Sequence, residues 1–475
     1  MIKKLLSVIL ALFVMTSCSA DKSIKVRPIL KIIGDVKEVT EFYDYSDLQQ
    51  YDIKKDDQNI KMVKLSDVLS KVETQGSDIQ ILTESYDGIS ALLNYDEIEN
   101  TYLYIDTDNH WCVYSEDLPV QSKIRYLENI VIVANKLENR QSCFRIINGF
   151  MDYTFSWGQL YMEEAVEATV LEGNAQKHDK TVGVYKKRKL IPLKNYYQSA
   201  ETCIGYFADG SEQKIDPDGY ILHRGNSADY IAPDKKTTIN NIIGVWFDYY
   251  EKGVEYVGQY VLTHPDEKIM VIEIDGYGYT AHEKFKPEFL SSLNPEHMRT
   301  VMPSISNVAL ASIITGKLPN ETGIKAKGER DLMIVDMFSS RKKSSVVEGD
   351  AALISMSVDQ ILSVDSNDSG CNDDEVFENA VEALKSNPEL IYIHFHGFDD
   401  VAHSHGPYSQ QAKDKITEID KYIKSLVESF DGTVMIVSDH GQHDTGREDK
   451  KGDHGEFIYE DMVIPFFFIG ENYER

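Results

Sequence analysis

The sequence predicts an α/β fold for residues 263–475, a mostly parallel sheet flanked by helices, preceded by two small α+β modules. In this C-terminal part, long apolar runs alternate with segments whose apolar residues recur at helical spacing, which is typical of strands joined by crossover helices. A chain of 475 residues also exceeds the size that one hydrophobic core usually fills. The predicted central strands are 268–275, 390–395 and 434–438.

Two helices are predicted between these strands, because apolar residues there recur every three or four positions and so share one face. The first face consists of Val376, Phe377, Ala380, Val381 and Leu384. The second face consists of Ile416, Ile419, Ile423, Leu426, Val427 and Phe430. The polar stretch 363–375 is predicted to be an exposed loop.

Short strands and short helices are predicted in two front modules, residues 23–140 and 141–262. Each module has an apolar segment, then an Asp-Gly turn, then another apolar strand. These features are 63–69, Asp87-Gly88 and 130–133 in the first module, and 190–196, Asp209-Gly210 and 220–222 in the second. The similar outlines indicate that the second module is a repeat of the first.

Residues 1–22 have the features of a lipoprotein-type signal peptide and tether. Two lysines precede the apolar run Leu5–Met15, and the run is followed by Thr16-Ser17-Cys18. This pattern resembles a bacterial lipoprotein signal, in which Cys18 would become the acylated first residue. The alternatives are an ordinary cleaved signal or a short anchor helix, because the run is short for a membrane-spanning helix. In each case we expect an extracytoplasmic protein, and the lipoprotein interpretation implies a lipid anchor in a bacterial membrane.

The chain has 49 basic and 78 acidic residues and a formal net charge of -29. This charge opposes broad contact with a phosphate backbone, so bulk binding of nucleic acid is not expected. A small anionic substrate is still compatible with the sequence, because bound cations dominate the field inside a site. The cysteines after Cys18 are too scattered for a CxxC motif and leave the disulfide state open; they are Cys112, Cys143, Cys203 and Cys371.

Histidines and aspartates gather after the predicted central strands, and 7 of the 13 histidines lie between His394 and His454. Ligands of open α/β sheets collect beyond the carboxyl ends of the strands, so we expect these side chains to meet and to hold divalent metal. Taken singly, each has a structural alternative as a turn residue, a helix cap or a loop histidine. The candidate ligands are Asp275, Asp399, His403, Asp439, His440 and His454.

The segment 303–316 contains the candidate nucleophile, Ser306. A helix that begins near Asn307 would direct its free N–H groups and its dipole toward Ser306, which stabilises an alkoxide and a neighbouring phosphoryl oxygen. The alternative is that Ser304 and Ser306 only cap this helix.

These residues resemble the alkaline phosphatase superfamily, most closely its type I phosphodiesterase and nucleotide pyrophosphatase branch. The resemblance covers residues 268–475 and rests on Asp399-xxx-His403-xx-Gly-Pro407, on the Ser-Asp-His-Gly run that ends at Gly441, and on the segment 315–324. It implies an alkaline-phosphatase-like fold with two zinc ions. One ion would be held by Asp399, His403 and His454, and the other by Asp275, Asp439, His440 and the oxygen of Ser306.

The resemblance implies a metal-dependent phosphoric ester hydrolase of the phosphodiesterase or nucleotide pyrophosphatase type, and the predicted signal peptide implies that it is exported. Two divalent cations, zinc first and manganese as the alternative, would bind the attacking and leaving oxygens, and Ser306 would form a phospho-serine intermediate. The expected substrate is a phosphoester small molecule, lipid or glycan. The alternatives are a phosphomonoesterase, a phospho-group transferase of the same superfamily, and a non-catalytic binding lipoprotein.

The sequence departs from this family at the nucleophile, where the phosphodiesterase branch usually has threonine with asparagine shortly after it. Here Asn307 follows Ser306 directly, and we predict that Asn307 contacts the substrate phosphate. Sulfatase activity is disfavoured, because no x-Pro-x-Arg pattern follows Ser306. Three more histidines are candidates for hydrogen bonding to the ligands or for substrate contact, with a plain loop role as the alternative; they are His396, His405 and His443.

The first module is also similar to the molybdopterin-binding domain of sulfite-oxidase-like proteins, through Ile33-Gly34, the segment 65–69 and Asp87-Gly88. That domain requires a thiolate on molybdenum, and neither Cys112 nor Cys143 fits its ligand motif. The resemblance therefore implies a shared scaffold for binding or spacing without the cofactor. Coincidental strand-turn-helix patterning is the alternative.

Overall fold

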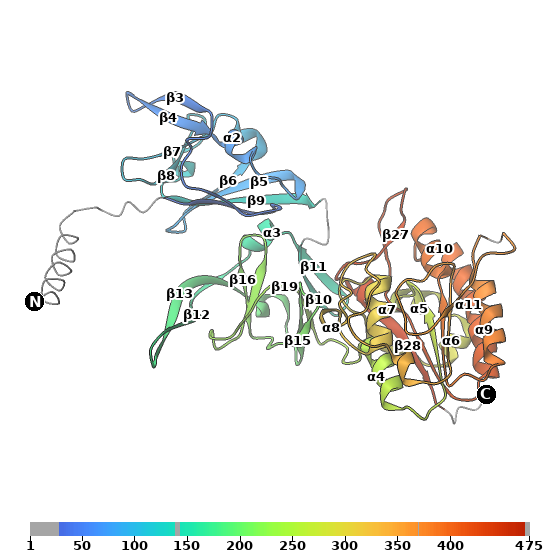
Figure 1. Ribbon diagram of the computed structural model, residues 1–475. Helices are drawn as coiled ribbons and strands as arrows, with labels where there is room; N and C mark the ends of the chain where they lie inside the picture. The colour runs from blue at the N-terminus through green and yellow to red at the C-terminus, as the bar shows by residue number, and fades with distance from the viewer. Residues whose placement is uncertain (1–27, 138–142, 369, 471–475) are drawn as a thin grey trace, which may run out of the picture. The chain divides into compact units, whose positions relative to one another are not determined.

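The computed structural model describes residues 28–137, 143–368 and 370–470 (Figure 1). The predicted signal peptide, including Cys18, lies outside these residues. The chain divides into two compact units, Met1–Glu138 and Asn139–Arg475. Within the described ranges, no helix is both long enough and apolar enough to cross a membrane.

The first unit contains two sheets that share one apolar core, to which Leu30, Val63, Leu103 and Ile130 contribute. The larger sheet has, in spatial order, β2 (Thr40–Phe42), β1 (Leu30–Gly34), β9 (Leu127–Leu137), β5 (Gly76–Ser85) and β6 (Ser90–Asn94). The smaller sheet has β3 (Gln50–Lys55), β4 (Gln58–Lys64), β7 (Tyr102–Ile105) and β8 (Trp111–Tyr114). The helical elements are α2 (Leu65–Leu69), η1 (Tyr95–Ile98) and η2 (Val120–Ser122).

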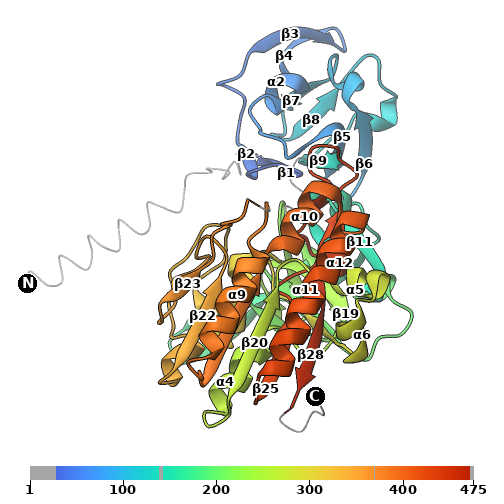
Figure 2. The ribbon, with the colours of Figure 1, turned by 90° about the vertical axis from the view of Figure 1, so that its right-hand side faces the viewer.

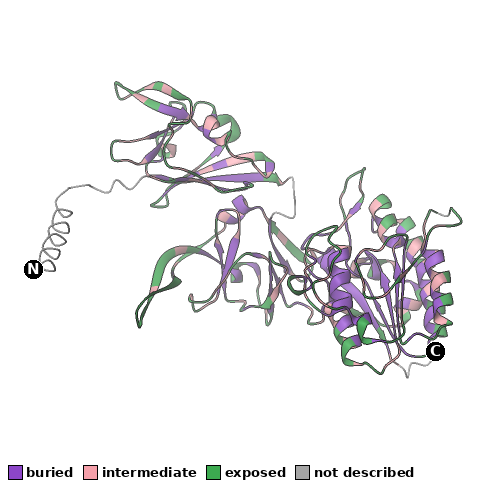
Figure 3. Ribbon diagram, viewed as in Figure 1, coloured by how far each residue is buried: buried purple, intermediate pink, exposed green. Residues whose placement is uncertain are grey.

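The second unit begins with another pair of sheets. The first has, in spatial order, β11 (Met151–Phe155), β10 (Phe144–Asn148), β19 (Ile242–Phe247), β14 (Cys203–Phe207) and β15 (Glu212–Lys214). The other has β12 (Val166–Lys177), β13 (Lys180–Pro192), β16 (Tyr220–His223), β17 (Ala228–Ile231) and β18 (Thr238–Ile239). The short helices are α3 (Trp157–Tyr161) and η3 (Leu193–Tyr196), and the outer part of the β12–β13 hairpin is exposed (Figure 3).

The five-stranded sheets of the two units have the same strand order and the same strand directions. In the first, β1 is parallel to β9 and the remaining neighbours are antiparallel. In the second, β10 is parallel to β19 and the remaining neighbours are antiparallel. The hairpins β3–β4 and β12–β13 also occupy corresponding places along the chain. A repeated module would have this shared topology, and the predicted boundaries at 140 and 262 stay predictions.

A seven-stranded sheet in the second unit carries the candidate site (Figure 2). Its spatial order is β21 (Glu296–Arg299), β28 (Val463–Ile469), β25 (Thr433–Val437), β20 (Ile269–Ile274), β24 (Leu390–Phe395), β22 (Ser344–Glu348) and β23 (Gln360–Leu362). The strands from β25 to β23 are parallel, and β28 is antiparallel to both of its neighbours. The predicted α/β fold with a mostly parallel sheet is therefore confirmed, and β20, β24 and β25 match the predicted strands to within one residue at each end.

Helices cover both faces of this sheet. One face packs against α5 (Tyr279–Phe285), α6 (Glu288–Ser292), α9 (Asp373–Leu384), α10 (Gly397–His405) and α11 (Gln410–Ser429). The other packs against α4 (Glu255–Thr263), α7 (Ser306–Thr315) and η4 (Met337–Ser340); the short helices α8 (Pro319–Thr322) and α12 (Tyr459–Met462) lie in connections. Because β20, β24 and β25 are buried on both sides, their sequences are mostly apolar, with Glu273 in β20 and His394 in β24 as exceptions (Figure 3).

The predicted helices between the central strands are confirmed as α9 and α11. The predicted loop 363–375 ends earlier than expected, because α9 begins at Asp373. Three acidic residues form the first turn of α9, where they interact favourably with the positive end of the helix dipole. The polarity of this stretch therefore marks a helix start as well as a loop.

Candidate metal centre

The candidate ligands lie beyond the carboxyl ends of three parallel strands. Asp275 follows β20 directly, and Asp439 follows β25 after one residue. Asp399 and His403 lie on α10, and their spacing of four residues places them on the same helix face. His454 follows β27 (Gly452–Asp453), which pairs with β26 (His443–Asp444). The sheet topology thus brings together residues that are far apart in the chain.

Asp275, Asp439 and His440 form the first ligand group, with donor atoms within 4.8 Å of one another. The Nε2 atom of His440 lies 3.2 Å from Oδ2 of Asp439 and 3.5 Å from Oδ1 of Asp275. The hydroxyl oxygen of Ser306 is 3.2 Å from Nε2 of His440 and 3.4 Å from Oδ1 of Asp275. All three ligand side chains are buried. The structure therefore places the candidate nucleophile against this group.

Asp399, His403 and His454 are the predicted second ligand group, whereas the donor atoms that lie within 4.8 Å of one another around Asp399 are those of Asp399, His440 and His454. The Nε2 atom of His403 lies 3.2 Å from Oδ2 of Asp399, and that of His454 lies 3.9 Å from Oδ1 of the same carboxylate. The rings of His454 and His440 are stacked, with centroids 3.8 Å apart. The two groups therefore adjoin, and all six predicted ligands and Ser306 lie together. Their roles as ligands stay predictions.

The three imidazoles of these groups share one hydrogen-bonding pattern. In each ring, Nδ1 donates its hydrogen to a backbone carbonyl at 2.8 to 3.0 Å. These pairs are His403 with Gly452, His440 with Gly441, and His454 with Ser304. The pattern leaves Nε2 of each neutral ring facing the aspartates as an acceptor, which is the form in which histidine binds metal.

The donors in both groups fit a divalent cation. They are imidazole nitrogens and carboxylate oxygens, which suit zinc and related first-row ions. Oδ2 of Asp439 is buried and has no hydrogen-bond partner among the described residues. Burial, together with the nearby charge of Asp275, raises the pKa of Asp439 to about 7. Two carboxylates held this close in the interior are stabilised by a cation, which supports a metal site here.

Ser306 occupies the first position of α7, one residue before the predicted start at Asn307. Neither serine caps the helix: the hydroxyl of Ser304 donates to the carbonyl of Glu456 at 3.2 Å, and that of Ser306 faces the first ligand group. The helix is buried from Asn307 to Thr315, so packing fixes the position of Ser306. The N-terminal end of the helix dipole therefore lies beside the candidate nucleophile.

Asn307 holds a neighbouring loop. Its Nδ2 donates to the carbonyl of Ala326 at 2.8 Å and to that of Glu329 at 2.9 Å. Both amide hydrogens are therefore engaged. A hydrogen bond from this amide to a substrate phosphate would require one of these two hydrogen bonds to break. The predicted contact with substrate stays a prediction.

The three additional histidines have different environments. Nδ1 of His396 lies 3.1 Å from Oδ2 of Asp275, where the ring can orient that carboxylate. Nδ1 of His443 lies 2.8 Å from Oδ1 of Asp461, and this pair is buried. His405 is exposed at the C-terminal end of α10 and belongs to none of the ligand groups among the described residues.

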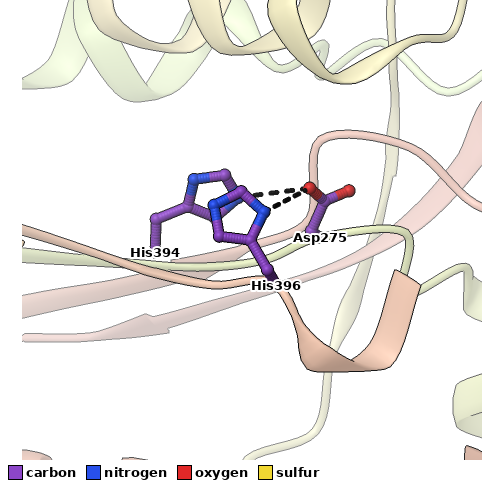
Figure 4. Close-up of side chains that lie close together, drawn as sticks. All are labelled: Asp275, His394 and His396. Atoms are coloured by element: carbon purple, nitrogen blue, oxygen red, sulfur yellow. Dashed lines mark hydrogen bonds and ion pairs between the residues drawn. The ribbon is translucent and has the colours of Figure 1, made fainter. Parts of the chain in front are cut away.

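Three buried ionisable residues beside the centre are not identified by the sequence analysis; they are Glu273, Glu348 and His394. Figure 4 shows His394 and His396 pointing to the carboxylate of Asp275. Side chains two residues apart on a strand lie on the same face. Glu273 and His394 lie two residues before Asp275 and His396, so this spacing could have identified them from the sequence. Glu348 has no such signal, since its strand, β22, is not predicted from the sequence.

Residues of the predicted second module hold the loop that follows His454. Nη2 of Arg145, on β10, lies 2.6 Å from Oε2 of Glu456, and both side chains are almost fully buried. The ring of Phe457 packs against Tyr206 of β14, with centroids 4.7 Å apart. The backbone N–H of Tyr459 donates to the carboxylate of Asp152 on β11. The loop is therefore fixed from outside the seven-stranded sheet.

Comparisons with known proteins give three kinds of match. Residues 359–464 match the family model for type I phosphodiesterase / nucleotide pyrophosphatase. GPI ethanolamine phosphate transferase 3 of Schizosaccharomyces pombe is 28% identical over 86 residues, which are 18% of this chain and 9% of that protein.

Two solved structures are also similar. The phosphonoacetate hydrolase of Sinorhizobium meliloti 1021 in complex with phosphonoformate is 15% identical and matches 37% of this chain and 57% of its own, with a TM-score of 0.31. Murine ectonucleotide pyrophosphatase / phosphodiesterase 5 in complex with AMP is 15% identical and matches 38% of this chain and 58% of its own, with a TM-score of 0.30. Each match spans less than two thirds of the relative.

The family match includes Asp399, His403, Asp439, His440 and His454, whereas Asp275 and Ser306 precede it and join the site through the fold. No comparison supports the similarity of the first module to a molybdopterin-binding domain. The C-terminal part of the chain thus matches the type I phosphodiesterase and nucleotide pyrophosphatase family, and this match indicates an enzyme that acts on phosphoesters.

Proposed function

We propose that this chain is an exported, metal-dependent phosphoester hydrolase of the phosphodiesterase type. The observation that carries the proposal is the position of the Ser306 hydroxyl, 3.4 Å from Asp275 and 3.2 Å from His440, beside two adjoining groups of metal-binding side chains. One cation would be held by Asp275, Asp439 and His440, and the other by Asp399, His403 and His454. Zinc suits these donors best, and manganese is the alternative.

Two bound cations would supply Lewis-acid stabilisation of the negative charge that develops on the oxygens at phosphorus and would lower the pKa of the serine hydroxyl. Ser306 Oγ forms a bond to phosphorus while the bond from phosphorus to the leaving oxygen breaks. The serine proton passes to solvent water, and the leaving oxygen takes a proton from water. In the second half, water attacks phosphorus, the bond from phosphorus to Ser306 breaks, and the hydroxyl is restored.

The residues around Ser306 position it for this step. Asp275 and His440 orient the hydroxyl, and the N-terminal end of α7 favours the negative charge that develops on it. The tautomer set by backbone carbonyls keeps each histidine ready to bind metal without rearrangement. These features support an attack by serine on phosphorus.

Transfer of the phospho group to an acceptor other than water is the second candidate function. The relative in Schizosaccharomyces pombe is named as an ethanolamine phosphate transferase, and its similar segment covers 86 residues. The same phospho-serine would then be attacked by an alcohol. A lipid or glycan acceptor would agree with the predicted lipid anchor at Cys18, which rests on the sequence of residues 1–22.

The test uses the purified full chain with a nitrophenyl phosphate monoester and a bis-nitrophenyl phosphate diester. We expect faster turnover of the diester, loss of turnover with a chelator, and recovery when zinc is restored. Ser306→Ala should lower kcat at least about 10³-fold. Ser312→Ala is the matched control, because this serine lies on the same helix and bonds to the carbonyl of Val308 away from the ligands.

Turnover that survives chelation, or that Ser306→Ala retains, would reject the proposed mechanism. The transferase function is tested by adding ethanolamine or glycerol to the same reaction. A phosphorylated alcohol among the products would support transfer, whereas release of phosphate or phosphomonoester to water alone would support hydrolysis.

A further inference from the structure

The β12–β13 hairpin is longer than the sheet to which it belongs. The register gives Ile191 and Pro192 of β13 partners in β16, and both lie at the inner end of the strand. Strands β12 and β13 pair with each other as far as Lys177 and Lys180. The outer, two-stranded part projects from the sheet with exposed side chains (Figure 1, Figure 3). Two strands alone gain little stability, so a role in binding would account for this length.

The hairpin is basic, although the chain as a whole is acidic. Residues 166–192 contain six basic and three acidic side chains, whereas the whole chain has a net charge of -29. Arg188 holds one of the acidic residues, Glu172, with Nε and Nη2 at 2.7 and 2.8 Å from its carboxylate oxygens. The other five basic residues are exposed lysines: Lys177, Lys180, Lys186, Lys187 and Lys189. The hairpin therefore presents positive charge to the solvent.

The hairpin tip lies beyond the screening distance of the sheet that carries it. Strands rise about 3.3 Å per residue, so Lys177 lies about 20 Å along β12 from Val170, the last buried residue of that strand. Charges in solvent are largely screened beyond about 8 Å at physiological ionic strength. The lysines at the tip therefore act on an approaching anionic surface with little opposition from acidic residues around that sheet.

Apolar side chains lie among these lysines. Val182 and Val184 are 62% and 49% exposed, and they share a face of β13 with Leu190, which packs in an apolar core. Ala175 is the cross-strand partner of Val182 and lies on the same face. Tyr185, on the opposite face, is 53% exposed. The face that is buried near the sheet thus continues into solvent at the tip.

This combination of side chains fits the interface of a lipid bilayer. Anionic headgroups attract lysines, and long lysine side chains keep their ammonium groups at the headgroups while apolar neighbours enter the layer below. The phosphate backbone of a nucleic acid would bind the lysines but would leave the valines in water. Lysines also protect a sheet edge from pairing with other chains, but that role does not account for exposed valines.

We propose that the outer part of the hairpin, residues 174–187, binds the surface of membranes that contain anionic phospholipid. Val182 and Val184 would enter the boundary between headgroups and acyl chains, and the neighbouring lysines would contact headgroup phosphates. The hairpin shares no residue with the ligand groups, so this binding is independent of the proposed activity. It is also distinct from the lipid anchor predicted at Cys18.

The test uses the purified full chain and vesicles of phosphatidylcholine with or without phosphatidylglycerol. Val182→Trp supplies a fluorescent probe at an exposed position, because the three native tryptophans are buried; they are Trp111, Trp157 and Trp246. With phosphatidylglycerol, the emission of the probe should shift to shorter wavelength, and about 0.5 M salt should reverse the shift. Phosphatidylcholine alone should cause no shift. Hydrogen exchange of residues 174–187 in wild type should slow under the same conditions.

Removal of charge from the hairpin should weaken this binding. In the Val182→Trp background, the combined changes Lys180→Gln, Lys186→Gln and Lys187→Gln should raise the vesicle concentration for a half-maximal shift about 10²-fold, since each lysine contributes about fivefold. The matched control removes the same charge from exposed positions of α11, by Lys413→Gln, Lys421→Gln and Lys424→Gln, and should leave that concentration unchanged. Any contribution of residues 1–22 is the same in both proteins.

An equal shift with both kinds of vesicle would overturn the proposal, as would equal half-maximal concentrations for the hairpin variant and its control. Slower exchange of residues 174–187 at high protein concentration, with no further change on adding vesicles, would also overturn it and show that a second copy of the chain binds there. Protection by a DNA duplex and not by vesicles would replace the membrane with nucleic acid. None of these results affects the test of the proposed function, which measures turnover of soluble substrates.

Discussion

Arg145 on β10 and Glu456, two residues after His454, form an ion pair of 2.6 Å whose side chains are 3% and 10% exposed. This contact joins the predicted second module to the loop that carries a candidate ligand. The backbone bond from Tyr459 to Asp152 and the packing of Phe457 on Tyr206 act on the same loop. Residues of the predicted second module therefore help to position the loop that follows His454.

Arg145→Met is expected to weaken the site without changing any ligand. It removes the guanidinium beside the buried carboxylate of Glu456 and leaves His443, 3.8 Å away, as a weaker charged neighbour. We therefore expect a loss of about 3 kcal/mol of stability and about 10- to 100-fold weaker metal retention. Hydrogen exchange of residues 452–460 and the zinc concentration for half-maximal turnover measure the two effects. Arg145→Met with Glu456→Gln should recover most of the stability, since the buried carboxylate charge is then removed together with the guanidinium. Unchanged exchange in the single variant would contradict the positioning role.

Gly441→Ala is expected to displace His440. A Cβ atom at this position would overlap the carbonyl oxygen of Glu460 and approach the Cα of Gly278 to 2.9 Å, and both are backbone atoms that cannot move aside alone. We expect a loss of about 3 kcal/mol and a fall in turnover together. Gly470→Ala is the control, because its added Cβ would meet only the ring of Phe468 at 3.8 Å. Thermal unfolding and diester turnover measure the result, and a fully active Gly441→Ala would show that the loop tolerates a shift.

His223 is expected to make the second unit less stable in acid. Its Nε2 donates to the carbonyl of Trp157 at 2.8 Å, and its Nδ1 accepts from the N–H of Gly225 at 3.0 Å, so the neutral ring satisfies both partners. Burial, opposed by the bond to Trp157, lowers the pKa of His223 to about 4. The stabilisation is therefore fully present above pH 6.5 and is lost as the pH falls through 4.

At pH 5 a lowering of this size corresponds to about 2 kcal/mol relative to a ring that titrates normally. His223→Asn removes the titration, so the difference in unfolding free energy between wild type and variant should depend on pH. Urea unfolding at pH 7, 5 and 4 measures it. A constant difference across this range would show that protonation of His223 is not linked to unfolding.

Removal of metal is expected to destabilise the seven-stranded sheet. Asp275 and Asp439 are buried side by side, and a chelator would leave them without a cation. If the ions are present at about 100 to 1,000 times their Kd, their loss costs about 3 to 4 kcal/mol. Hydrogen exchange of β20 and β25 should rise with chelator, while that of β1 and β9 in the first unit should not. Equal changes in both units would mean that the chelator acts elsewhere.

Residues that follow apolar strands were predictable from the sequence. Asp275, Asp399 and Asp439 each come directly after such a strand or in the helix that follows it, and parallel strands place their carboxyl ends at one edge. The strands β20, β24 and β25 were also predictable, because burial on both faces makes nearly every residue in them apolar. Ser306 was predictable as a candidate nucleophile because it lies at the predicted start of a helix, where the helix dipole favours negative charge.

Contacts between distant segments were not predictable in this way. Glu348 lies on a short strand whose sequence, Ser-Ser-Val-Val-Glu, is only partly apolar, and its role depends on which strand lies beside it. Arg145 precedes Glu456 by more than three hundred residues, and no local pattern links them. The hydrogen bonds that occupy Asn307 likewise come from a loop whose path the sequence does not specify.

The sequence by itself determined the class of the C-terminal fold, the identity of the candidate ligands and the candidate nucleophile, because hydrophobic periodicity and residue chemistry are local properties of the chain. The tertiary structure alone decided that Ser306 faces Asp275 and His440, that Asn307 holds a loop, and that Glu273, Glu348 and His394 form a buried ionisable row beside the ligands. Those relationships depend on strand order and register, which are fixed by the packing of segments that are remote in sequence.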